Sequence, residues 1–204
     1  MPTLLRIDSS SRLEDSVTRA LADEVCDRWR RSHPDGEVVV RDVVVQPIPH
    51  IADATIRGFY AETLDAELTA ATALSDELID ELLAADAVVI GVPMYNFSIP
   101  SALKAYIDHV VRAGRTFAVG ADGQLSGLIA DRPLYLCVAK GAPYTGTAFE
   151  PMDFTERYLL GLFGFLGITS AEVLRVEGTT IAPEVMASTM ATAREHLAET
   201  LPVG

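Results

Sequence analysis

The chain has 204 residues, enough for one well-packed core and too few for two comfortable domains. Its net charge of −13 argues against nucleic acid or an anionic membrane as a partner, because either would require a basic patch. No apolar run approaches the roughly 18 residues of a membrane span. The first ten residues carry Arg6 and Asp8 and do not resemble a signal peptide, so a cytoplasmic location is expected.

Alternating strand and helix patterns run along the whole chain. The predicted strands are residues 3–8, 37–43, 86–92, 133–139 and 170–178. Apolar residues at helical spacing follow each strand, at 18–29, 68–83, 103–111, 154–163 and 186–201. Residues 116–130 interrupt this order with glycines on both sides of Asp122, which indicates a hairpin or an excursion.

This order of elements predicts an α/β protein with a doubly wound parallel sheet and right-handed crossovers. Five strands favour the flavodoxin-like order 2-1-3-4-5, with helices on both faces in three α/β/α layers. The sequence contains no internal repeat or linker, so residues 1–204 are expected to form a single domain.

Two cysteines, Cys26 and Cys137, fall in a predicted helix and a predicted strand. A disulfide and two buried free thiols both fit these positions, and the lack of a secretory signal favours free thiols. The four histidines are scattered and no Cys/His group has zinc spacing, so no metal is expected.

Doubly wound sheets bind ligands at the carboxyl ends of their strands, near the switch point between strands 1 and 3. The loops at 9–17, 93–99 and 140–147 are therefore the candidate binding loops. The first loop lacks both G-x-G-x-x-G and the P-loop motif. It offers Ser10, then Ser16 and Thr18 at a helix start, where hydroxyls and free N–H groups suit a phosphate monoester. That Ser16 merely caps the helix is an equally open interpretation.

The second loop carries large side chains where a small polar loop is usual: Met94, Tyr95, Asn96 and Phe97. A flat, partly apolar ligand such as an isoalloxazine ring would rest on the apolar residues, with Asn96 orienting its polar edge. The alternative is that they pack against the following helix or in an interface.

The third loop places Gly141 where a backbone would approach a ligand closely, although a plain turn glycine fits as well. Lys140 beside it would lean toward the polar end of the ring or lie in solvent. A phosphate cradle, a ring platform and a close glycine together fit FMN better than other common ligands. The absence of a G-x-S-x-G elbow weakens a hydrolase interpretation.

The segment PMYNFSIPSALKAYIDHVVRAGRTF (93–117) closely resembles the bacterial FMN-dependent NADH-azoreductase and NAD(P)H:quinone oxidoreductase family. The segments VRDVVVQPIP (40–49), ALSDELIDELLAADAVVI (73–90) and LGLFGFLGIT (160–169) are also similar to that family. The resemblance runs from Thr3 to the last helix.

The resemblance implies that one group of residues holds the FMN phosphate and ribityl chain and a second group holds the ring. The first group is Ser10, Ser16, Val17 and Thr18, and the second is Met94, Tyr95, Asn96, Phe97, Ala139, Lys140, Gly141 and Ala142. It also implies a homodimer with active sites at the interface, and Phe97 with Phe163 or a neighbour as substrate contacts.

The chain departs from the family pattern in two places. Ala139-Lys140-Gly141-Ala142 replaces the usual Ser-Arg-Gly-Gly, and Ala118 and Val119 replace an arginine and an aromatic residue. Backbone contacts should preserve the FMN site, so these departures concern the range of substrates.

The expected reaction is a two-electron, ping-pong reduction. NADH or NADPH stacks on the flavin first, and a quinone or aromatic azo compound then takes the same place. FMN carries the chemistry, so no catalytic side chain is predicted and Asn96 has an orienting role. The alternatives are a flavodoxin-like electron carrier that turns over no small substrate, and a flavin-free hydrolase of similar topology.

Overall fold

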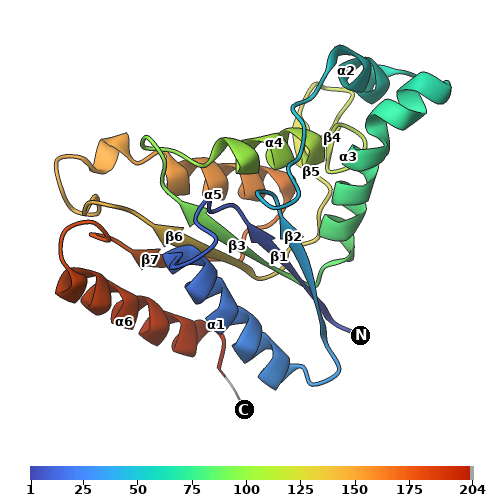
Figure 1. Ribbon diagram of the computed structural model, residues 1–204. Coiled ribbons are helices and arrows are strands. Elements are labelled where there is room, and N and C mark those ends of the chain that lie inside the picture. Colours follow the sequence, from blue (N-terminus) through green and yellow to red (C-terminus); the bar gives the residue numbers. More distant parts are fainter. Residues whose placement is uncertain (203–204) are drawn as a thin grey trace.

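Five parallel strands form one sheet in the computed structural model of the protein, which describes residues 1–202 (Figure 1). Their order is β2-β1-β3-β6-β7, which confirms the predicted flavodoxin-like topology because β4 and β5 form a separate hairpin. The strands of the sheet are β1 (Thr3–Asp8), β2 (Glu37–Asp42), β3 (Ala87–Pro93), β6 (Leu134–Ala139) and β7 (Ala171–Val176).

Helices cover both faces of this sheet and give the predicted three layers (Figure 1). Successive residues of a strand face opposite layers. Leu4 and Val89 therefore join one core, whereas Leu5 and Ile90 join the other. The first core is covered by α1 (Val17–Ser32) and α6 (Pro183–Thr200), and the second by α3 (Ala66–Ala84), α4 (Ser101–Val110) and α5 (Thr155–Leu166).

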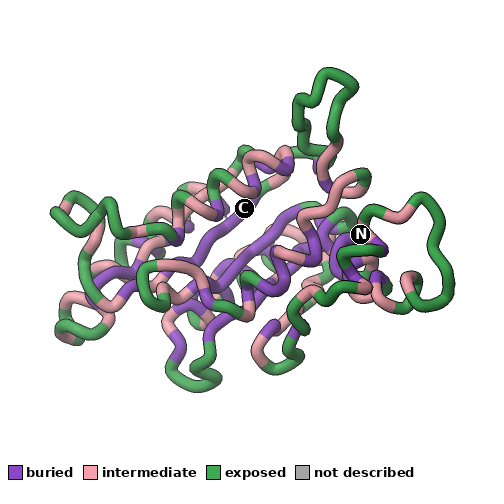
Figure 2. The backbone as a smooth tube through the Cα atoms, turned by 90° about the horizontal axis from the view of Figure 1, so that it is seen from above, coloured by how far each residue is buried: buried purple, intermediate pink, exposed green. Residues whose placement is uncertain are grey.

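The central strands are buried on both sides, whereas green, exposed segments surround them in Figure 2. In β3 every residue from Ala87 to Val92 is buried. Such two-sided burial explains why this strand is an unbroken apolar run in the sequence.

One helix, α2 (Asp53–Tyr60), is absent from the sequence prediction. It spans only eight residues, and its two buried residues, Thr55 and Gly58, are not large apolar ones, so its packing leaves little signal in the sequence. A Cβ atom on Gly58 would lie 2.5 Å from Thr72 Cγ2. The glycine therefore allows α2 to pack closely against α3.

The predicted excursion is a hairpin of β4 (Phe117–Val119) and β5 (Leu125–Gly127). It crosses the end of α5 at two glycines. A Cβ on Gly127 would lie 2.3 Å from Leu166 O, and one on Gly167, where φ is +112°, would lie 2.2 Å from Ile129 O. Neither position has room for a side chain.

Cys26 and Cys137 are free and buried, as predicted, and burial raises the pKa of both thiols. Between residues 1 and 202 the structure contains no helix with the length and apolar character needed to cross a bilayer.

Candidate functional site

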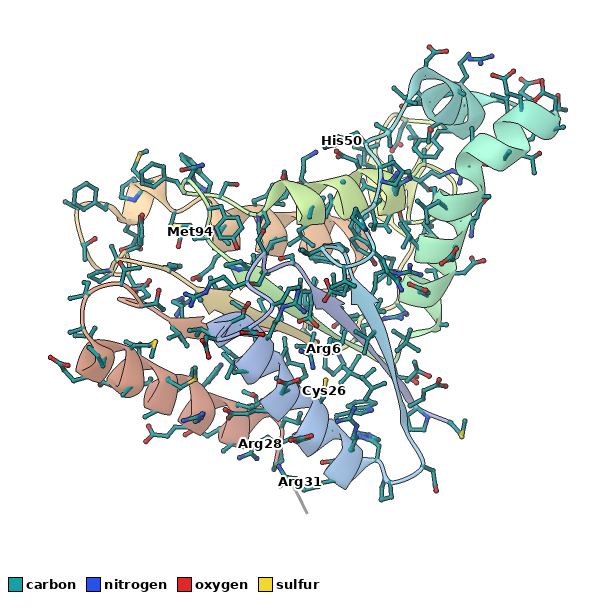
Figure 3. All side chains as sticks on the ribbon, viewed as in Figure 1. Arg6, Cys26, Arg28, Arg31, His50 and Met94 are labelled. Atoms are coloured by element: carbon teal, nitrogen blue, oxygen red, sulfur yellow. The ribbon has the colours of Figure 1, made fainter. Side chains whose placement is uncertain are left out.

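A cavity of about 480 Å³ opens between the loops that follow β1, β3 and β6. It lies at the switch point of the sheet and has the size typical of a small-molecule site. Met94, labelled in Figure 3, marks the loop after β3. Residues from all three predicted loops line the cavity: Ser10, Ser16, Val17, Thr18, Met94, Tyr95, Ala139 and Gly141.

Hydroxyl groups gather on one side of this cavity, at the first turn of α1. Ser16 is the N-cap: its Oγ accepts a hydrogen bond from Arg19 N at 3.4 Å and lies 3.3 Å from Thr18 Oγ1. The first N–H groups of a helix have no intrahelical acceptor, and they favour an anion. With the Ser10 hydroxyl, this turn forms a polar cradle that suits a phosphate. Capping and ligand binding are thus compatible roles for Ser16.

The loop after β3 contains a strained turn beside the cavity. Tyr95 and Ser98 exchange backbone hydrogen bonds of 2.9 and 3.1 Å around Asn96 and Phe97, whose φ angles are +49° and +72°. Positive φ at both central positions is typical of a type I′ turn, which asparagine tolerates and phenylalanine rarely adopts. Within residues 1–202 no hydrogen bond is found for the N–H of Asn96 or Phe97. The turn therefore presents two free donors.

Asn96 and Phe97 do not line the 480 Å³ cavity itself. The Phe97 ring is 42% exposed and meets Tyr144 edge-on, with 6.3 Å between ring centroids. Phe97 O accepts a hydrogen bond from Phe154 N at 3.0 Å, which connects this turn to the segment before α5. The turn thus carries an aromatic surface at the edge of the site.

Two hydrogen bonds connect the three loops. Met94 N donates to Ala139 O at 2.8 Å and extends the pairing of β3 with β6. The Tyr95 hydroxyl accepts a hydrogen bond from Ser11 N at 3.1 Å, so the ring loop and the phosphate loop are in direct contact.

The prediction for the Lys140 side chain is wrong. It is 1% exposed and lies in a cluster of carboxylates, at 2.5 Å from Asp153, 2.6 Å from Glu156 and 3.0 Å from Glu177. Burial alone would lower the pKa of this lysine, but these hydrogen bonds outweigh it and raise the pKa. Its backbone N–H and C=O are bonded to Val176 and Thr179. Lys140 therefore supports the loop and offers no group to a ligand.

Gly141 lines the cavity as predicted, and its oxygen accepts hydrogen bonds from Thr180 N at 3.1 Å and Thr180 Oγ1 at 3.0 Å. A Cβ at Gly141 would lie 3.2 Å from Thr180 Oγ1, so a larger residue would crowd this contact. Ala142 is exposed and lies outside the cavity lining.

Phe163 is also placed differently from the prediction. It lies on α5, and its side chain is 1% exposed and packs in the core between this helix and the sheet. It cannot touch a substrate, because neighbouring core residues enclose it. The exposed neighbours Phe154 and Leu160, at 41% and 38%, are the apolar side chains of this region that a ligand could reach.

Several of the residues that line the cavity were not identified from the sequence. They are Arg12, Asp15, Pro93, Thr179, Thr180 and Met186. Thr179 and Thr180 lie in the loop after β7, so the rule that selected the other loops would have found them. Asp15 has φ of +53°, a local conformation that no sequence pattern signalled.

A second, larger cavity of about 750 Å³ lies between the loop after β6 and α5. It shares no lining residue with the first, and its charged residues are Glu150, Asp153, Glu156, Arg157 and Arg175. It lacks the hydroxyl cradle and lies away from the β1–β3 switch point. We therefore assign the smaller cavity as the ligand site. No group of three or more His, Cys, Asp or Glu side chains in residues 1–202 could hold a metal ion.

Comparison with known proteins gives consistent matches over nearly the full chain. The family model described as "Flavodoxin-like fold" matches residues 2–201. An "FMN-dependent NADH:quinone oxidoreductase 1" of Trichormus variabilis is 42% identical over 95% of this chain and 93% of its own. One named "FMN-dependent NADH:quinone oxidoreductase" from Xanthobacter autotrophicus is 48% identical over 85% of each chain. The crystal structure of an azoreductase from Bacillus anthracis superposes with a TM-score of 0.89, at 28% identity, over 98% of this chain and 99% of that one.

Proposed function

Because this chain belongs to the flavodoxin-like fold family, we propose that it is an FMN-dependent oxidoreductase that reduces quinones and aromatic azo compounds with NADH or NADPH. The observation that carries the proposal is the cavity at the switch point, with a hydroxyl cradle on α1 and a strained aromatic turn after β3. An electron carrier would need the cradle, but exposed aromatic side chains beside the ring site favour a surface for small substrates.

The residues present fit FMN. Ser10, Ser16 and Thr18, with the first N–H groups of α1, would hold the phosphate. Met94 and Tyr95 would contact the ring. When bound, FMN supplies the two-electron chemistry, and the protein supplies binding and orientation.

The turn at Asn96 and Phe97 would orient the ring and its partners. Its two free N–H groups would donate to the polar edge of the ring, while the Phe97 side chain would cover a stacked nicotinamide or acceptor. A single stacking surface holds one partner at a time, so NADH or NADPH and then the acceptor would use it in turn. The reaction would therefore be ping-pong.

A homodimer is part of the proposal. Apolar side chains near the Phe97 turn are unusually exposed, and a second copy of the chain would cover them beside the site. They are Phe97 at 42%, Phe149 at 65%, Met152 at 41% and Phe154 at 41%. The two free buried thiols suit a reducing compartment, and we propose a cytoplasmic location.

The test is a flavin titration followed by turnover. The purified chain should bind FMN in a one-to-one ratio and then oxidise NADH or NADPH when a quinone is present. Stoichiometric FMN without turnover of any quinone or azo dye would identify an electron carrier instead. A well-folded protein that binds no FMN would overturn the proposal.

A further inference from the structure

Arg12 is the one arginine that lines the candidate site. Its side chain is exposed, and the hydrogen bonds found for it within residues 1–202 involve only its backbone. The arginines of the adjoining β1 and α1, Arg6 and Arg19, are paired: Arg6 with Asp8 at 2.8 Å, and Arg19 with Asp42 at 2.5 Å. Arg12 therefore places a positive charge at this site, and no carboxylate of residues 1–202 forms an ion pair with it.

The backbone of Arg12 is fixed from two sides. Its N–H donates to Ser10 Oγ at 3.3 Å, and its oxygen accepts a hydrogen bond from Arg19 Nε at 3.2 Å. The same guanidinium donates to Ser10 O at 2.9 Å and to Asp42. Arg19 thus binds three acceptors with one planar group, an arrangement that a lysine cannot reproduce.

We propose that Arg12 is a ligand of the FMN phosphate and that Arg19 is the positioning residue that presents it. The proposal rests on the proposed function and adds to it. A phosphate monoester carries nearly two negative charges, and this protein carries a net charge of −13. The carboxylate of Asp15 lines the same cavity and adds repulsion. An arginine beside the cradle offsets the repulsion from the net charge and from Asp15, because it forms charge-assisted, bidentate hydrogen bonds with a phosphate.

The experiment compares FMN with riboflavin, which has the same ring and no phosphate. Flavin-free, full-length protein is titrated with each flavin while fluorescence quenching is followed. Arg12→Gln should weaken FMN binding roughly 10- to 100-fold and leave riboflavin binding unchanged. Added salt should weaken FMN binding less in this variant than in the wild type. Arg31→Gln is the matched control, because Arg31 is an exposed arginine at the opposite end of α1 (Figure 3).

Arg19→Lys tests positioning, since it keeps the charge and removes the planar group. FMN binding should fall while riboflavin binding holds, and Arg12→Gln combined with Arg19→Lys should bind FMN no more weakly than Arg12→Gln alone. Equal FMN affinity in Arg12→Gln and wild type would overturn the assignment of Arg12. A loss of both flavins in Arg19→Lys, or additive losses, would overturn the positioning role. Folded wild-type protein that binds neither flavin would instead refute the proposed function.

Discussion

Lys140 Nζ lies 3.0 Å from Glu177 Oε1, in a region where the lysine is almost fully buried. Glu177 also accepts hydrogen bonds from Tyr144 N at 3.1 Å and Thr145 Oγ1 at 2.9 Å. This ion pair therefore fixes the loop after β6 to the end of β7. Gly141, which lines the candidate site, lies on that loop.

Lys140→Met should lower the free energy of unfolding by about 3–5 kcal/mol, because it leaves three carboxylates without their buried cation. Lys104→Met is the matched control, since Lys104 is half exposed and pairs with Asp108 on the surface of α4. Its cost should be below about 1 kcal/mol. Urea unfolding measures both variants, and equal costs would contradict a structural role for the Lys140 cluster.

The Glu177 contact predicts a pH dependence. Burial alone would raise the pKa of Glu177, but hydrogen bonds from Lys140 and Thr145 lower it below its ordinary 4.5. A carboxyl whose pKa is depressed on folding adds stability above 4.5 and loses it as the pH falls through the folded-state pKa. Glu177→Gln should flatten that acid limb when unfolding is measured from neutral pH downward. An unchanged acid limb would show that other carboxyls cause it.

Replacing Ser16 and Thr18 together by alanine should lower FMN affinity on the order of a hundredfold, since two charge-assisted hydrogen bonds are lost. Riboflavin affinity should hardly change. Because Ser16 also caps α1, Asp65→Ala provides the control: Asp65 caps α3 through a 2.9 Å hydrogen bond from Leu68 N. Its stability cost should be about 1 kcal/mol with no effect on either flavin. FMN binding by the double variant that equals wild type would place the phosphate elsewhere.

The backbone strain at Phe97 predicts a difference between two substitutions. Glycine adopts positive φ freely, whereas alanine does not. Phe97→Gly should therefore be more stable than Phe97→Ala by about 1 kcal/mol in thermal or chemical unfolding, while both lose the aromatic ring. If the two variants are equally stable, φ at this position is not strained in solution.

The shared platform predicts parallel double-reciprocal plots when NADH is varied at several fixed quinone concentrations. NADH alone should remove the yellow colour of the bound flavin before any acceptor is added. Phe97→Ala should slow both half-reactions, because donor and acceptor stack on the same turn. Intersecting plots with a detectable ternary complex would refute a single platform.

The sequence was sufficient for the topology and for three of the loops that line the candidate cavity, because both follow from apolar periodicity and from the geometry of parallel sheets. It was not sufficient for the direction of a side chain. Lys140 is charged and lies in a loop that was predicted to bind a ligand. Its side chain is nevertheless buried, because it pairs with carboxylates from later parts of the chain, Asp153 and Glu177 among them. The prediction for Phe163 was wrong for a similar reason. An aromatic residue on a half-buried helix can face the core or the surface, and packing against the rest of the fold decides which.

The hydrogen bond from Ser11 N to the Tyr95 hydroxyl joins residues 84 positions apart in the sequence. Under the proposed function these two loops would hold opposite ends of FMN, so this hydrogen bond would set their spacing before the ligand binds. FMN would then bind as a bivalent ligand to two sites whose spacing is already set. Once one end of the flavin is bound, the other end is held at high local concentration near its own loop. We therefore expect a substitution that shifts one of these loops to weaken FMN binding unless a second substitution restores the spacing between them.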